Sequence, residues 1–145
     1  MNSTFQSIKS VFRHPELGLL LVRLVVGPVL ALAGYNKFAA GTQTLHAVGK
    51  CIDYLGLDVG SENIATMFFG VLAAGTELAG GVLLVIGLLF RTSAFFLFIT
   101  MLVATLSVVD SSGGDFGRYG YPLVMAGVML GLLFTGPGRI SLQKD

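Results

Sequence analysis

Three ionisable side chains lie inside long apolar segments, where an isolated charge is costly. Arg23 interrupts the apolar run 17–38, Lys37 lies at the end of that run, and Glu77 lies in the middle of the run 64–90. A bare charge at bilayer depth costs roughly 3 kcal/mol or more, so such groups usually face a protein interior and pair there. An acid and two bases so placed could transfer protons or hydrogen-bond the polar head of a ligand.

Small residues predict which way these charges point. Each of the three lies three or four residues from a glycine in the same run, and at 3.6 residues per turn it shares a face with that glycine. Membrane helices pack closely along small residues, so the charges should point into a helix bundle. The predicted packing seams are Gly27, Ala31 and Gly34; Ala73, Gly80 and Gly87; Thr100, Ala104 and Ser107; and Gly120, Gly127 and Gly131.

The partner of Glu77 depends on depth and on side-chain direction. With helix midpoints aligned, Arg23 lies about 7 Å from the level of Glu77 and Lys37 about 14 Å from it. Side chains lean toward the N-terminus of their own helix, which favours Lys37. Because a guanidinium can pair with a carboxylate through two hydrogen bonds, we prefer Arg23. We expect one buried cluster of Glu77, Arg23 and Lys37, with Tyr35 and Asn36 as further ligand-binding groups; the cluster could equally be a salt bridge that only fixes helix register.

The composition is that of an integral membrane protein. Of the 145 residues, 54% are hydrophobic and 12% are charged, whereas soluble domains carry about 25% charged residues. A hydrocarbon core of about 30 Å needs roughly 20 helical residues. Four runs approach or exceed this length, which predicts an all-α membrane four-helix bundle forming one domain over residues 1–145. The expected helices cover residues 17–38, 64–90, 92–109 and 119–135.

The first run has a competing interpretation. Ala31-Leu32-Ala33 resembles a signal-peptide cleavage site. Arg23 interrupts what would be the apolar core of such a peptide, and the run is long enough to remain as a span, so we favour a span.

Two other segments are predicted to be amphipathic. Between the first two runs, Leu45, Val48, Ile52 and Leu55 recur at helical spacing. They favour a short helix that lies on the membrane or caps the bundle, with a surface loop as the alternative. Residues 1–16 could form an interfacial helix.

The rest of the composition excludes several kinds of site. Cys51 is the only cysteine, so the chain has no internal disulfide, no CxxC pair and no four-cysteine metal site. It is expected in an external loop, inert or joined to a partner. His14 and His46 lie outside the apolar runs, so a haem or metal site within the membrane would need a partner chain. A net charge of +1 gives no basic surface for nucleic acid.

Loop charges predict the orientation in the membrane. Lys9 and Arg13 precede the first run, Arg91 separates the second and third, and Arg139 and Lys144 follow the fourth. The other loops are mainly acidic. Positive residues favour the cytoplasmic side, so both termini are expected in the cytoplasm of a cell with an inner membrane.

Several motifs resemble the DoxX/DoxD-like family of small four-helix membrane proteins. They include Arg23, and the resemblance spans about residues 17–142. The chain departs from the pattern near the end of the third run, where residues 107–110 supply no histidine. The other motifs are Gly34-Tyr35-Asn36-Lys37-Phe38, Gly75-Thr76-Glu77-Leu78-Ala79-Gly80-Gly81, Gly87-Leu88-Leu89-Phe90-Arg91-Thr92-Ser93-Ala94 and Thr135-Gly136-Pro137-Gly138-Arg139-Ile140-Ser141-Leu142.

The resemblance implies a link to redox chemistry. DoxD-like members belong to thiosulfate:quinone oxidoreductases, and DoxX-type members are associated with membrane oxidoreductase complexes and oxidative-stress defence. We therefore expect a membrane subunit of a redox complex, in which Glu77, Arg23 and Lys37 act on a quinone held also by Tyr35 and Asn36. Soluble oxidoreductase partners or a homo-oligomer are expected. The alternatives are a structural scaffold for soluble partners and a small proton-coupled transporter.

Overall fold

Four long helices confirm the all-α membrane fold in the computed structural model, which describes residues 15–143. Each of them is long and apolar enough to cross a bilayer. The predicted helix at residues 1–16 lies outside the described residues, apart from Pro15 and Glu16, which begin the first span. The four helices are α2 (Pro15–Ala39), α4 (Ile64–Ile86), α5 (Phe90–Ser111) and α6 (Phe116–Thr135).

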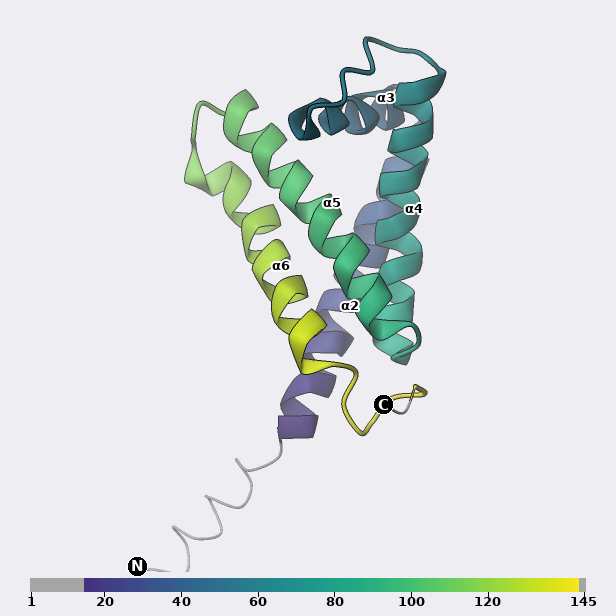
Figure 1. Ribbon diagram of the computed structural model, residues 1–145, viewed down its shortest axis with the longest axis vertical. Coiled ribbons are helices and arrows are strands. Elements are labelled where there is room, and N and C mark those ends of the chain that lie inside the picture. The colour runs from purple at the N-terminus through teal and green to yellow at the C-terminus, as the bar shows by residue number, and fades with distance from the viewer. Residues whose placement is uncertain (1–14, 144–145) are drawn as a thin grey trace, which may run out of the picture.

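The helices pack in chain order, α2 on α4, α4 on α5 and α5 on α6 (Figure 1). They converge toward the end where α2 begins and α6 stops, and the core lies there. Toward the other end α5 leans away from α4, and a short helix crosses the opening. The core residues are Val26, Leu30, Leu84, Phe90, Ala94, Leu97, Met101, Ala126, Met129 and Leu132.

The turn between α4 and α5 comes earlier than predicted. The expected run 64–90 ends as a helix at Ile86, and Phe90 already belongs to α5, so the turn precedes Arg91. Gly87 has a φ of 74°, which glycine adopts without steric cost. A side chain there would also overlap the guanidinium of Arg23, so two independent reasons favour glycine at position 87.

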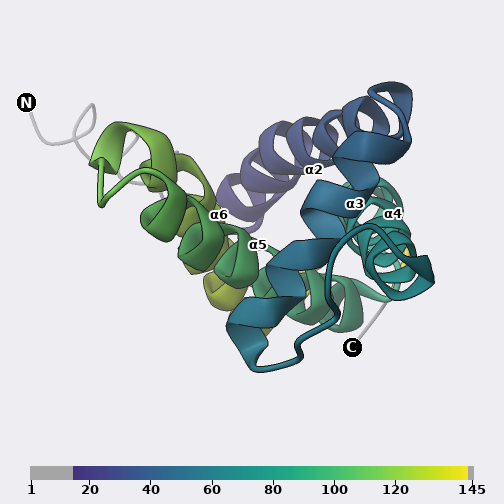
Figure 2. The same ribbon diagram turned by 90° about the horizontal axis from the view of Figure 1, so that it is seen from above.

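The predicted amphipathic helix is present, and it packs against the bundle. Helix α3 (Thr42–Lys50) continues into the 3-10 helix η1 (Cys51–Leu55), and together they lie across the ends of α4 and α5 (Figure 2). Leu45 is buried, whereas Leu55, expected on the same face, is 46% exposed. The reason is that the chain tightens into a 3-10 turn after Lys50, which rotates Leu55 away from the bundle.

Glycines allow the backbones of α3 and α4 to touch. A side chain at Gly49 would overlap the carbonyl oxygen of Thr66, and one at Gly70 would overlap that of Leu45. The seam predicted on α2 is also correct, because Gly34 lies against the backbone of α4.

The glycine seam predicted on α6 is wrong for two of its residues. Gly127 and Gly131 have nothing within 4 Å of an added Cβ. Helix α6 instead buries Ala126, Met129 and Leu132 against its neighbours. Spacing alone could not tell which of the two α6 faces packs, because both carry small or apolar residues.

The α3–α4 contact gives a direct test of this packing. Gly70→Ala should destabilise the protein by about 1–3 kcal/mol, because the new methyl group cannot avoid backbone atoms of α3. The matched control is Gly75→Ala in the same helix, where an added Cβ meets nothing within 4 Å. That change should be neutral or stabilise by up to about 1 kcal/mol. Thermal unfolding in detergent, followed by circular dichroism, measures both, and equal melting temperatures would contradict the packing.

Candidate functional site

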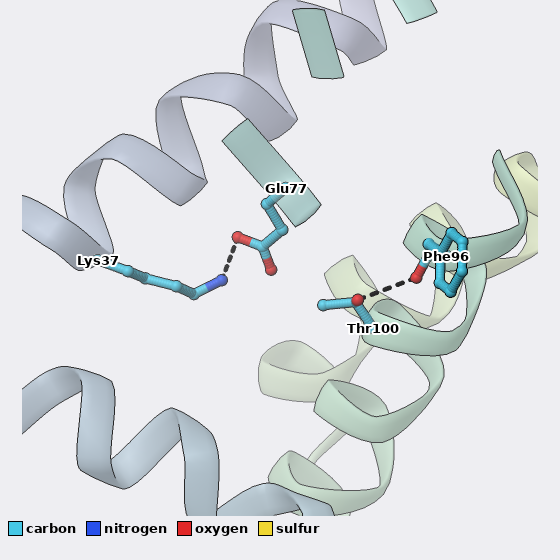
Figure 3. A network of polar contacts seen from close by, with 4 residues as sticks. All are labelled: Lys37, Glu77, Phe96 and Thr100. Carbon is cyan, nitrogen blue, oxygen red and sulfur yellow. Dashed lines mark hydrogen bonds and ion pairs between the residues drawn. The ribbon is translucent and has the colours of Figure 1, made fainter. Parts of the chain in front are cut away.

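Glu77 forms a buried ion pair with Lys37. The side chain of Glu77 is 1% exposed, and its Oε2 accepts a hydrogen bond from Nζ of Lys37, which is 26% exposed. Figure 3 shows the lysine reaching in from α2, with the second carboxylate oxygen turned toward α5. The prediction that Glu77 belongs to a buried acid–base pair is confirmed, and the lean of the two side chains along their antiparallel helices explains the choice of lysine.

The preference for Arg23 as the partner of Glu77 is wrong. Arg23 is 1% exposed, and within residues 15–143 its guanidinium donates hydrogen bonds only to backbone carbonyls. Its Nε donates to Leu84 O at 2.8 Å and its Nη2 to Val85 O at 2.9 Å. Its Nη1 donates to Pro137 O at 2.9 Å and to Ile140 O at 2.7 Å.

The end of α4 explains why Arg23 binds there. The last carbonyls of a helix have no partner within it and carry partial negative charge, which favours a cation. Leu84 lies seven residues beyond Glu77, or about 10 Å along the helix. Arg23 also lies over the ring of Phe90, at 5.5 Å from its centroid. Arg23 therefore ties α2, the end of α4 and the segment after α6 together, and it is not part of the Glu77 site.

Tyr35 and Asn36 are on the outer surface of α2. Tyr35 is 58% exposed, and Asn36 is exposed beside it. Neither residue lines the cavity that lies beside Glu77. The structure thus brings together Glu77 and Lys37 and leaves Arg23, Tyr35 and Asn36 elsewhere.

A cavity of about 420 Å³ lies between α4 and α5, under α3 and η1, with the ion pair in its wall. Ala73 and Ala104 line the cavity, and their small side chains leave part of its volume unfilled. Most of the lining is apolar. The lining residues are Lys37, Val48, Gly49, Cys51, Ile52, Phe69, Leu72, Ala73, Thr76, Glu77, Phe96, Ile99, Thr100, Val103, Ala104, Ser107 and Val108.

Hydroxyl groups are the other polar features of this cavity. The hydroxyl of Thr100 donates to Phe96 O at 2.9 Å, which leaves its oxygen able to accept a hydrogen bond (Figure 3). Ser107 lies near η1, and its Oγ accepts a hydrogen bond from the thiol of Cys51 at 3.2 Å. Spacing predicts that Thr100, Ala104 and Ser107 form a packing seam, whereas all three line the cavity. The hydroxyl groups of Thr100 and Ser107 are the signal that could have distinguished a cavity wall from a packing seam, because a close apolar contact does not need them.

Two contacts join η1 to α5 over the cavity. The first is the Cys51–Ser107 hydrogen bond. Cys51, expected in an external loop, begins η1 and lines the cavity. In the second, the Tyr54 hydroxyl donates to Asp110 Oδ2 at 2.8 Å. This hydrogen bond to a carboxylate raises the pKa of Tyr54. Helix α3 and η1 together form the roof of the cavity. This roof is attached to α4 through glycine contacts and to α5 through side chains.

The segment that builds the cavity also identifies the protein's relatives. Residues 18–110 match the DoxX family. The chain belongs to the DoxX family. It matches no curated protein and no solved structure. The DoxX match includes the ion pair and every residue that lines the cavity, whereas α6 lies beyond it.

Within residues 15–143 of this DoxX protein, no three histidine, cysteine or acidic side chains gather as metal ligands. His46 instead packs at the α3–α4 contact, where its Nδ1 lies 2.8 Å from Oγ1 of Thr66. That hydroxyl is also bonded to Asn63, and it completes the cap of α4. His46 therefore has a structural environment at the roof.

The cavity wall offers groups that can form hydrogen bonds and exchange protons. A carboxylate and an ammonium group offer an acceptor and a donor side by side, and either could exchange a proton with a ligand oxygen. Most of the wall is apolar, and surroundings of low polarity strengthen hydrogen bonds to the pair. These groups would suit a ligand that has a polar head and is otherwise apolar.

Proposed function

We propose that this protein is the membrane subunit of a redox complex and holds the head of a quinone beside Glu77 and Lys37. The observation that carries the proposal is the buried Lys37–Glu77 pair in the wall of an apolar cavity between two membrane-spanning helices. Membership of the DoxX family adds the expectation of redox chemistry by analogy. A soluble or membrane oxidoreductase partner would supply the electrons.

Cavity size and polarity support a ligand of this class. Sites for small molecules usually measure about 300–1,000 Å³ and are mainly apolar, with a few placed polar groups. Reduction of a quinone consumes two electrons and two protons and converts two carbonyl oxygens into hydroxyls. Lys37 could donate a hydrogen bond to one oxygen, and Glu77 could pass protons to it. Thr100 and Ser107 offer further hydrogen-bonding groups along α5.

The test is quinone content. Protein purified in mild detergent or in lipid nanodiscs should carry stoichiometric quinone, measured by mass spectrometry of the lipid extract. Glu77→Gln should lose at least about nine-tenths of it while remaining folded, because the neutral amide no longer forms the ion pair that holds the ammonium of Lys37 in the cavity wall. Glu62→Gln, an exposed acid outside the cavity, is the matched control and should keep its quinone. Equal quinone content in Glu77→Gln and wild type, or none in either, would reject the proposal.

A structural scaffold is the second candidate. The observation in its favour is that Lys37 and Glu77 satisfy each other and join α2 to α4 without any ligand. A scaffold would keep its partners after an apolar replacement of the pair, whereas a quinone subunit would lose its ligand. A proton-coupled carrier ranks third, because α4 runs unbroken through Gly80 and Gly81 and offers no interrupted helix of the kind that many carriers use.

We also propose an orientation with both termini in the cytoplasm of a cell with an inner membrane. Arg91 and Arg139 lie toward one end of the bundle, and the opposite loops carry mainly acids, in keeping with the positive-inside rule. In a Cys51→Ser background, Glu62→Cys should react with a membrane-impermeant maleimide on intact cells and Arg139→Cys should not. The reverse pattern would overturn this orientation.

A further inference from the structure

We infer that the cavity takes its ligand sideways from the bilayer, with the ligand's apolar tail lying in the groove between Leu72 of α4 and Phe96 of α5. This inference rests on the proposed function and names the substrate class more closely, as a lipid-soluble amphiphile with a polar head and an apolar tail. Three features of the cavity walls carry it.

The aqueous end of the cavity is closed. Helix α3 and η1 form the roof through Val48, Gly49, Cys51 and Ile52, all of which line the space. At Gly49 the backbone of α3 lies directly against that of α4. On the other side the thiol of Cys51 reaches Ser107 of α5. A ligand that entered from water would have to break these contacts.

The opposite end is closed by close packing of the same two helices. A side chain at Gly80 of α4 would lie 3.0 Å from Leu97 of α5, so the helices touch there. Leu97 is fully buried in the core. Because Glu77 is three residues from Gly80 in α4, the ion pair lies just above this floor.

The side between roof and floor is open and apolar. Leu72 is 52% exposed and Phe96 is 54% exposed, and both line the cavity. Both belong to membrane-spanning helices, so they face lipid chains at that depth. Polar groups are deep in the cavity and apolar groups are at its rim, which matches the polarity of an amphiphile whose head enters first. A fully polar ligand would find no favourable path through this rim.

The experiment uses a ubiquinone analogue with a decyl tail that carries a diazirine at its far end. The full-length protein is illuminated with this probe in lipid nanodiscs, and labelled residues are located by mass spectrometry. We expect labelling at the rim residues Leu72 and Phe96 that untagged decylubiquinone suppresses. Labelling of the roof residues Val48 and Ile52 in place of the rim would overturn lateral entry while leaving the proposed function intact.

A pair of variants separates the groove from the head site. Ala104→Phe places a ring in the cavity and should reduce competable labelling at least about tenfold, because the space is already small. Ala79→Phe adds the same ring on the exposed surface of α4, outside the cavity, and should label like wild type. Equal labelling in both variants would overturn the groove assignment. If wild type shows neither competable labelling nor bound quinone, the proposed function fails, and lateral entry fails with it.

Discussion

Arg23→Met should destabilise the protein by about 3–5 kcal/mol, one of two strong effects that we expect from single substitutions. The guanidinium donates to the carbonyls of Leu84, Val85, Pro137 and Ile140, and it is 1% exposed. Methionine fills a similar volume but satisfies none of these oxygens. An unsatisfied buried carbonyl costs about 1–3 kcal/mol, and water at the membrane surface should recover part of the total.

The loss of stability in Arg23→Met should at first be confined to the segment after α6 and the α4–α5 turn. The segment after α6 is held to α4 by Arg23 and by two backbone bonds, from Leu142 N to Ile86 O and from Gln143 N to Gly87 O. We therefore expect faster hydrogen exchange in this segment and in the α4–α5 turn of Arg23→Met, before α3 or the roof is affected. Hydrogen-exchange mass spectrometry in detergent measures the order of these changes.

Two controls separate hydrogen bonding from charge. Arg23→Lys keeps the positive charge near the end of α4 but cannot reach four carbonyls, so it should recover less than half of the lost stability. Arg118→Met removes an exposed arginine and should change stability by no more than about 0.5 kcal/mol. If Arg23→Lys matches the wild type in its unfolding midpoint, charge alone explains the role of Arg23 and the carbonyl network is not required.

Lys37→Met should cost about 3–5 kcal/mol at neutral pH, because it leaves the carboxylate of Glu77 buried without a partner. Glu77→Gln should cost less, about 1–2 kcal/mol, because the lysine it leaves behind is 26% exposed and can turn toward water. The asymmetry follows from the unequal burial of the two partners. Unfolding midpoints in denaturant-titrated micelles give both values.

The double variant Lys37→Met/Glu77→Leu completes the cycle. Removing both charges leaves no stranded ion, so the pair of changes should cost no more than about 1 kcal/mol and far less than the sum of the single changes. A double variant that is as unstable as the sum would mean that the two residues act independently and that the buried pair does not exist. If the double variant is stable but binds no quinone, the Lys37–Glu77 pair is needed for ligand binding and not for stability, as the proposed function expects.

Part of the site could be predicted from residue type and spacing. Glu77 lies in the middle of an apolar run near small residues, and burial with a basic partner follows from the cost of a lone charge in the membrane. The choice between Lys37 and Arg23 turned on two opposing arguments. Side-chain lean was correct, and the argument from midpoint distance and bidentate geometry was not. The distance argument failed because it ignored the unpaired carbonyls at the end of α4, which bind Arg23 more completely than one carboxylate could.

The sequence by itself determined the four membrane spans, the short amphipathic helix and the burial of Glu77. These depend on apolar run length, on periodicity and on the cost of a charge in lipid, all of which are local properties of the chain. Only the tertiary structure decided that α5 leans away from α4, that α3 and η1 roof the gap, and that Thr100 and Ser107 line a cavity. The physical reason is that small residues permit close packing and equally permit a void, and the relative angle of two helices selects between these outcomes.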